Sequence, residues 1–374
     1  MIATPRTDRS VLGRWWWTVD RWTLVALAIL IAFGALMAFA ASPSVASRIR
    51  IDSFSLVKHH FALLLPAGAL LIGVSLMDVK NVRRLAVVGF LGGCALLGLT
   101  LVMGTEIKGA SRWISLGGFS LQPSEFVKPC FAVVAAWVFS LQHGPDRIPG
   151  NLIAMVLFAP VLALLLLQPD LGMAVVITCT FLAQFFLAGL SLIWVALLGG
   201  LGVAGLFGAY FTFHHVRERI DSFLDPAAGD RYQIDRSLEA FANGGWFGRG
   251  PGEGTVKLVL PDAHSDFVFS VMGEEFGTVV ALFIVAVFCF VILRGIARLM
   301  NEQNIFVLLA AAGLLVSFGL QAAINMASSL SMIPTKGMTL PFISYGGSSL
   351  LVLSLTMGML LALTRKRPGM GGIV

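Results

Sequence analysis

Apolar runs of about twenty residues recur along this chain from end to end, and they leave it few folds. Each run is long enough to cross about 30 Å of hydrocarbon as a helix. Hydrophobic residues make up 57% of the 374 and charged residues only 12%, a balance that excludes an ordinary soluble domain. A membrane β-barrel would show short segments of alternating hydropathy instead. The pattern therefore predicts an all-α polytopic membrane protein.

The runs predict about ten transmembrane helices in a single membrane domain, residues 23–364. A long polar segment, residues 214–265, separates the seventh helix from the eighth. Within it we expect a short helix at 237–242, followed by a glycine-rich break at 244–254. The expected bounds of the ten helices are 23–41, 61–77, 85–103, 123–141, 151–168, 171–189, 190–213, 267–293, 305–328 and 346–364.

Basic residues predict how the helices are oriented. In a ten-helix count, one side carries Arg6, Arg9, Arg14, Arg21, Lys80, Arg83, Arg84, Arg294, Arg298, Arg365, Lys366 and Arg367. The positive-inside rule makes that side cytoplasmic, so the terminal segments 1–22 and 365–374 are expected inside and residues 214–265 outside. Arg48, Arg50 and Lys58 on the other side weaken this bias without reversing it. The net charge of +6 reflects these anchors and does not indicate a nucleic-acid partner.

Asp266 is an acid at the edge of the membrane, because the apolar run of the eighth helix starts at Phe267. It follows Asp262 and His264 at alternating spacing. A carboxylate so close to lipid is unfavourable unless a cation partners it or the chemistry uses it. A divalent cation, Mg²⁺ or Mn²⁺, shared with Asp262 or His264 stays open here, although two acids are thin coordination.

Polar residues also stand at three other helix ends. Glu125 and Lys128 are three apart and share one face of the fourth helix, where we expect an ion pair that either braces the helix end or lines a cavity. Arg112 lies in a predicted loop before that helix. Asp170 lies in a tight turn before the sixth helix, either as an N-cap or as a functional acid.

The segment before the last helix is rich in hydroxyls and glycines and carries Lys336 and Ser344. By the predicted topology it lies on the outer face, together with Asp266, Arg112, Asp170 and the Glu125 and Lys128 pair. Basic residues near an acid suit an anionic headgroup beside a general base. The cations would neutralise a diphosphate leaving group while the carboxylate removed a proton from an incoming hydroxyl. A pyrophosphate on a lipid carrier is one substrate that meets such a site.

Five motifs resemble those of the SEDS family (shape, elongation, division and sporulation). They are Ser-Arg-Trp-Ile-Ser-Leu-Gly at 111–117, Leu-Gln-Pro-Ser-Glu-Phe-Val-Lys at 121–128, Gln-Pro-Asp-Leu-Gly at 168–172, His-Ser-Asp-Phe at 264–267 and Ser-Tyr-Gly-Gly-Ser-Ser at 344–349. The match covers essentially the whole chain, in order. The runs at 250–254 and 332–341 are similar to the division members, because elongation members usually lack Pro-Thr-Lys-Gly, here at 334–337. Departures are mild, at Asp262, Ser265, Ala327 and Ser328.

The resemblance implies a ten-helix peptidoglycan glycosyltransferase that polymerises lipid II at the outer face of the cytoplasmic membrane, at the division site. It also implies a class B penicillin-binding transpeptidase of the FtsI type and other divisome membrane proteins as partners. The family's essential acid falls on Asp266, its fourth-helix acid and base on Glu125 and Lys128, and its loop arginine on Arg112.

On this reading Asp266 deprotonates the sugar 4-hydroxyl of one lipid-linked disaccharide, which attacks the anomeric carbon of another with inversion. Undecaprenyl diphosphate leaves, steadied by Arg112 and Lys128, while Glu125 holds Lys128 in place. We expect the remaining candidates to contact substrate, namely Lys336, His264, Asp170 and Ser344. A lipid II flippase, a division scaffold and an elongation-type glycosyltransferase are the alternatives. Charges that cluster outside rather than at both leaflets disfavour the flippase, and a scaffold would not need Glu125 and Lys128.

Overall fold

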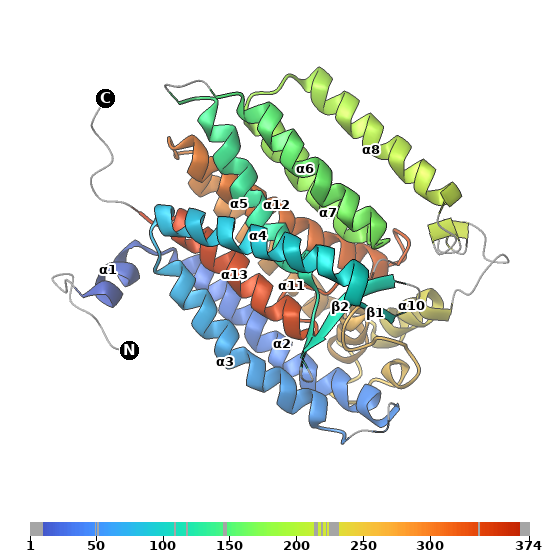
Figure 1. Ribbon diagram of the computed structural model, residues 1–374. Coiled ribbons are helices and arrows are strands. Elements are labelled where there is room, and N and C mark those ends of the chain that lie inside the picture. The colour runs from blue at the N-terminus through green and yellow to red at the C-terminus, as the bar shows by residue number, and fades with distance from the viewer. Residues whose placement is uncertain are drawn as a thin grey trace.

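Long apolar helices lie side by side in one bundle (Figure 1). The computed structural model describes residues 10–48, 50, 52–107, 110–116, 119–144, 148–212, 216–217, 220–221, 223, 232–335 and 337–366. Within these ranges eight helices are long and apolar enough to cross a membrane. They are α2 (Arg21–Arg48), α3 (Ser55–Ser75), α4 (Val79–Met103), α5 (Pro123–Leu141), α6 (Gly150–Leu167), α8 (Leu192–Thr212), α11 (Val268–Leu299) and α12 (Ile305–Ser329).

Two shorter apolar helices complete the predicted set. α7 (Leu171–Leu187) and α13 (Gly347–Leu363) have 17 residues each, the lower end of the length that crosses a bilayer. All ten predicted spans therefore coincide with helices, and the prediction of a helical multi-pass membrane protein is confirmed. α3 and α4 begin before the predicted 61 and 85, because their first turns carry polar and charged residues that the apolar runs exclude.

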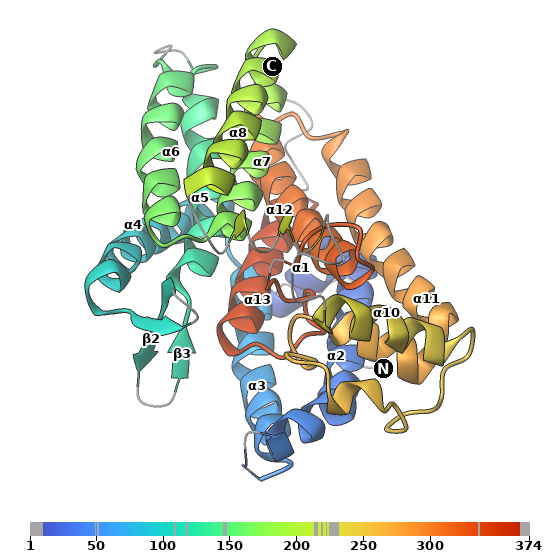
Figure 2. The same cartoon turned by 90° about the vertical axis from the view of Figure 1, so that its right-hand side faces the viewer.

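Smaller elements gather at one end of the bundle, here called the sheet end (Figure 1). Three antiparallel strands form a sheet there, β1 (Thr105–Ile107), β2 (Ala110–Leu116) and β3 (Phe119–Leu121). The sequence predicted a loop around Arg112, and this was wrong, because strands so short leave no trace in a search for membrane-length runs. The long polar segment contributes α10 (Tyr232–Gly244), which contains the predicted helix 237–242, and the short 3-10 helix η1 (Val256–Leu258). Figure 2 shows α10 lying against the start of α11.

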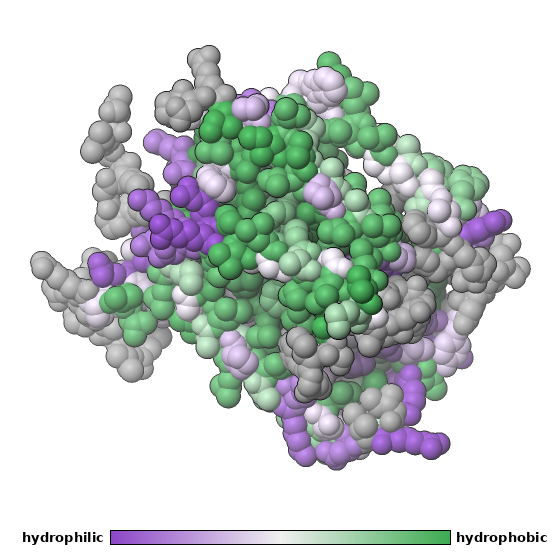
Figure 3. Space-filling model, in the orientation of Figure 1, coloured by the Kyte–Doolittle hydropathy of each residue, from purple (hydrophilic) through white to green (hydrophobic). Residues whose placement is uncertain are grey.

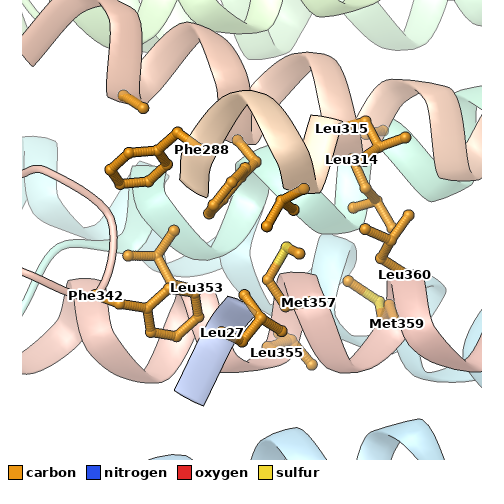
Figure 4. Close-up of a cluster of buried hydrophobic side chains, with 14 of the residues drawn as sticks. Leu27, Phe288, Leu314, Leu315, Phe342, Leu353, Leu355, Met357, Met359 and Leu360 are labelled. Carbon is orange, nitrogen blue, oxygen red and sulfur yellow. The ribbon is translucent and has the colours of Figure 1, made fainter. Parts of the chain in front are cut away.

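The middle of the bundle is apolar inside and out. The space-filling view shows a broad hydrophobic surface with polar residues gathered toward its ends (Figure 3). Inside, Phe288 of α11, Leu314 of α12 and Leu353 of α13 are buried together (Figure 4). Phe342 joins them from the segment before α13, with 1% of its surface exposed. That segment is therefore anchored in the core, which holds the neighbouring polar residues in place.

The opposite end, where α1 (Val11–Thr18) lies, is closed by a cluster of charges that we call the Asp20 clasp. Asp20 is 2% exposed and pairs with two arginines of α11, at 3.0 Å from Arg294 Nε and 2.8 Å from Arg298 Nε. Arg298 also donates to Thr364 O, and the backbone N–H of Lys366 donates to Thr18 O. The first and last described segments thus meet at this end of the bundle.

The clasp makes stability depend on acid pH. Burial alone would raise the pKa of Asp20, but the hydrogen bond from Arg294 and the charges of Arg298 and Arg294 outweigh it and hold the pKa below its ordinary 3.8. A folded-state pKa below the unfolded one gives stability that is present above the unfolded pKa and is lost as the pH falls through the folded pKa. We therefore expect the thermal midpoint of the wild type to fall more steeply than that of Asp20→Asn between about pH 5 and about pH 3.

A matched control is Asp52→Asn, because Asp52 pairs with Lys58 at an exposed position where both side chains are more than half accessible. Exposed pairs contribute about 0–1 kcal/mol, so this variant should keep the pH profile of the wild type. Parallel pH profiles for Asp20→Asn and the wild type would contradict the role given to the clasp.

Candidate active site

Asp266 lies just before α11 at the sheet end, and its backbone is held by α12. Asn325 Nδ2 donates to Asp266 O at 2.8 Å and to Met338 O at 2.5 Å, so one buried amide joins the acid to the segment before α13. A Cβ built on Gly337 would lie 3.4 Å from Asp266 Oδ2, which places the carboxylate against that same segment. Lys336, predicted to contact substrate, lies outside the described residues.

The residues on either side of this contact tie the two segments together twice more. Ser344 Oγ donates to Ser265 O at 2.5 Å, and the N–H of Tyr345 donates to His264 O at 2.9 Å. The only O–H of Ser344 is thereby used inside the protein, so this residue holds the acid's loop in place. The His264 ring lies 5.1 Å from the Tyr345 ring, and its burial lowers the pKa of His264 from its usual value.

Lys128 is buried on α5, and its partner differs from the predicted one. Its ammonium group donates to Gln321 Oε1 of α12, and no ion pair joins it to Glu125. Both are nevertheless buried, at 4% and 7% exposure. Three residues of separation place them on one face, but the amide of Gln321 competes for the ammonium group across the helix interface. The sequence was therefore right about their location and wrong about their pairing.

Gln321 connects Lys128 to the segment before α13. Its Nε2 donates to Thr339 O and to Thr339 Oγ1, both at 3.1 Å, and the Thr339 hydroxyl lies 2.7 Å from Ser349 Oγ. Glu125 Oε2 is buried and has no hydrogen-bond partner within the described part of the chain. A continuous polar path thus runs from the start of α5 through α12 to the start of α13.

Arg112 of β2 and Asp170 at the start of α7 lie close together. Arg112 Nη1 lies 3.8 Å from Asp170 Oδ1, Nε donates to Gln168 O at 3.2 Å, and Nη2 donates to Pro169 O. Asp170 also caps α7, accepting from Met173 N at 3.4 Å. The predicted N-cap is confirmed. Because Asp170 and two carbonyls already engage Arg112, much of its charge is balanced within the protein.

The two amides of α12 were missed as site residues. Gln321 and Asn325 are four apart, so they share one face of a helix whose only other polar residues are serines, and both are buried. Polar side chains that project from a membrane helix usually face other helices and hydrogen-bond across them. That spacing, read in the same way as Glu125 and Lys128, would have shown that this face of α12 is turned toward other helices.

We expect Gln321→Leu to destabilise the protein by about 1.5–3 kcal/mol, because it leaves the buried ammonium of Lys128 without its acceptor. The measurement is thermal unfolding of the purified protein in detergent. Gln303→Leu is the control, since that side chain is exposed and its change should stay within about 0.5 kcal/mol. Equal midpoints for the two variants would show that Lys128 does not depend on Gln321.

The open question of a divalent cation can be tested against the donor set. Mg²⁺ and Mn²⁺ are held by several oxygen ligands. The described residues contain no cluster of three or more carboxylate, imidazole or thiol groups that could hold an ion. Asp262, His264 and Asp266 do not form such a cluster, so these three side chains do not by themselves supply a site for a divalent cation.

Comparisons with known proteins agree with the fold and the motifs. The profile of the FtsW/RodA/SpoVE cell cycle proteins matches residues 21–368. A protein of Caulobacter vibrioides named "Probable peptidoglycan glycosyltransferase FtsW" is 47% identical, covering 99% of this chain and 95% of its own. One of the same name from Trichlorobacter lovleyi is 39% identical over 90% of this chain and 91% of its own.

Solved structures give the same assignment. A chain from a peptidoglycan synthase complex that coordinates polymerization and crosslinking superposes with a TM-score of 0.74 at 27% identity, covering 92% of this chain and 97% of its own. The rod shape determining protein RodA of Thermus thermophilus gives a TM-score of 0.69 at 26% identity, with 93% and 97% covered. The chain therefore belongs to the FtsW/RodA/SpoVE family of cell cycle proteins, the SEDS family that its motifs resemble.

Proposed function

We propose that this protein is a peptidoglycan glycosyltransferase that polymerises lipid II during cell division. The observation that carries the proposal is the grouping of the Asp266 carboxylate and the buried Lys128 ammonium around α12, at one end of an apolar bundle. Relatives named as glycosyltransferases of the FtsW type match the chain over almost its whole length, which supports the division reading over the elongation reading. The sheet end is then the outer face, and the Asp20 clasp lies in the cytoplasm.

In this proposal Asp266 is the general base. Its carboxylate takes the proton of the sugar 4-hydroxyl of one lipid-linked disaccharide as that oxygen bonds to the anomeric carbon of a second. The bond from the anomeric carbon to the diphosphate breaks at the same time, and undecaprenyl diphosphate leaves with inversion. Asn325 and Ser344 hold the backbone on both sides of Asp266, which keeps the base in a fixed position for this step.

Lys128 is the better placed of the two cations to balance the leaving diphosphate. No carboxylate of the described residues forms an ion pair with it, whereas Arg112 is already engaged by Asp170 and two carbonyls. A cation in a low-dielectric site stabilises developing negative charge more strongly than one in water. We therefore propose that Lys128 stabilises the leaving diphosphate, whereas Arg112 holds the outer hairpins around it in shape.

The partner is expected to be a class B penicillin-binding transpeptidase of the FtsI type, with other divisome membrane proteins. Support comes from the likeness to a chain of a synthase complex that couples polymerization to crosslinking. Co-purification of the two full-length chains from a membrane extract would test this assembly.

The experiment that decides the function uses purified protein in liposomes with labelled lipid II. Glycan polymer on addition of substrate supports the proposal. Movement of lipid II between leaflets without polymer would make the protein a flippase. If neither polymer nor movement of lipid II is observed in the presence of the transpeptidase, the protein would be a scaffold that recruits division proteins.

A further inference from the structure

α11 is interrupted at Gly277, and the preceding loop is joined to the break by backbone hydrogen bonds. Gly277 has φ 80° and ψ 173°, which no helix accommodates. The N–H groups of Thr278 and Val279 donate to Gly245 O at 2.9 Å and Trp246 O at 3.2 Å, instead of to the carbonyls four residues back. Those two carbonyls are therefore released from the helix.

The released carbonyls accept from the same loop. Glu274 O accepts from the N–H of Arg249 and Glu275 O from that of Gly250, both at 3.0 Å. Two helical bonds are thus replaced by four bonds to residues 245–250. Buried backbone groups are almost always paired, and here the pairing fixes the loop against one position of α11.

The side chains of the same two glutamates hold the next part of the loop. Glu274 is fully buried and accepts from Thr255 N at 3.0 Å and from Val256 N at 3.1 Å. Glu275, 1% exposed, accepts from Gly252 N at 2.9 Å and pairs with Lys257.

Lys257 completes the arrangement. It is 6% exposed, and besides Glu275 its ammonium donates to Gly252 O and to Ala40 O of α2, each at 2.9 Å. All three N–H donors are therefore used. The ion pair joins residues eighteen positions apart in the chain, and Asp266 lies midway between them. Lys257 and Glu275 close the loop that carries the acid.

We propose that the Lys257–Glu275 ion pair is a positioning device for Asp266: it closes the loop 257–275 and sets where the carboxylate stands relative to α2 and α11. The inference rests on the proposed function in that Asp266 is taken as the base. Neither residue needs to touch substrate. A displacement of a catalytic group by about 1 Å can lower a rate by about 100-fold. An ion pair that fixes the position of Asp266 therefore affects the rate measurably even though it does not touch substrate.

A purely structural role is the rival explanation, and stability separates the two. Removing one partner of a buried ion pair is strongly destabilising, whereas replacing both by apolar residues is often neutral. Lys257→Met alone would then lower both stability and rate. The double variant Lys257→Met with Glu275→Leu is expected to recover thermal stability. It still lacks the hydrogen bonds that Lys257 and Glu275 make to the backbone of Gly252 and Ala40.

The experiment measures kcat, KM and thermal midpoint with lipid II in liposomes, and hydrogen exchange of the same proteins. For Lys257→Met and for the double variant we expect kcat to fall about tenfold or more, with KM within about threefold of the wild type. Amides of residues 258–267 should exchange faster than in the wild type, while those of α5 and α12 stay protected. Glu275→Gln keeps a single acceptor oxygen, which can serve Lys257 or Gly252 N but not both, so we expect a kcat between those of the wild type and Lys257→Met. Arg236→Met, which breaks an exposed pair with Glu239 on α10, is the matched control and should change neither quantity.

A double variant with wild-type kcat would overturn the proposal, as would Lys257→Met with unchanged exchange at 258–267. The exchange measurement does not depend on catalysis. If the wild type makes no polymer, the proposed function fails, while faster exchange in Lys257→Met would still support the tie.

Discussion

Asp266→Asn is expected to lower lipid II polymerisation by about 10²–10⁴-fold while the protein stays folded and keeps its partner. An amide has nearly the shape of a carboxylate but does not accept a proton at neutral pH. The contacts that hold this residue should survive, because Asn325 bonds to its backbone oxygen and not to the side chain. The measurement is polymer formed per folded molecule in liposomes, with thermal unfolding and co-purification of the transpeptidase recorded on the same samples.

Asp262→Asn is the control for that experiment. Asp262 has φ 51°, a conformation that asparagine tolerates well, and its backbone oxygen accepts from Ser265, Asp266 and Phe267. The local structure should therefore persist, and we expect a rate within about threefold of the wild type because a side chain outside the reaction supplies little of the barrier lowering. A wild-type rate of polymerisation by Asp266→Asn would rule out Asp266 as the general base.

Gly277→Ala is expected to be the most disruptive small change at the break in α11. At φ 80° and ψ 173° the backbone lies in a region that is essentially restricted to glycine, where other residues cost about 1–3 kcal/mol. A Cβ there would also overlap the backbone of Gly248 and Trp246, which are bonded into the break. We predict a loss of at least about 3 kcal/mol, seen as a low yield of folded protein and a depressed thermal midpoint in detergent.

Gly245→Ala separates the steric effect from the conformational one. Gly245 also has a positive φ, 56°, but a Cβ on it would meet nothing within 4 Å. Only the cost of the left-handed conformation remains, about 1–2 kcal/mol. Similar midpoints for the two alanine variants would mean that the loop moves aside and that the break is not tightly joined.

The helices could be predicted because one physical requirement dominates them. A span must be apolar over most of its length, so α5 begins and ends where the sequence predicts, at Pro123 and Leu141. Asp266, Arg112 and Asp170 were placed at one end for the same reason, since charges collect where the apolar runs stop. The structure brings these residues to the sheet end, and their roles in catalysis stay predictions.

The pairings could not be predicted, because they depend on which helices touch. Lys128 has a carboxylate one turn away, yet its ammonium donates to Gln321 on another helix. In the sequence, Lys257 is one lysine of a long polar loop. Glu275 lies near the start of a predicted apolar span. Gly277 gave no sign of a break either, since glycine is frequent in membrane helices. Each of these depends on contacts across the bundle that spacing along one segment does not contain.

The break in α11 also fixes one end of the stretch of chain that leads to Asp266. Four backbone bonds fix residues 245–250 against Gly277, and the chain must then travel from Gly250 to Asp266 and back along α11 to Glu275. We expect that lengthening or shortening that path by a single residue would shift Asp266 relative to Asn325. Along residues 251–265, length is therefore constrained as well as composition, because Lys257 and the backbone groups bonded to Glu274 and Glu275 must reach α11.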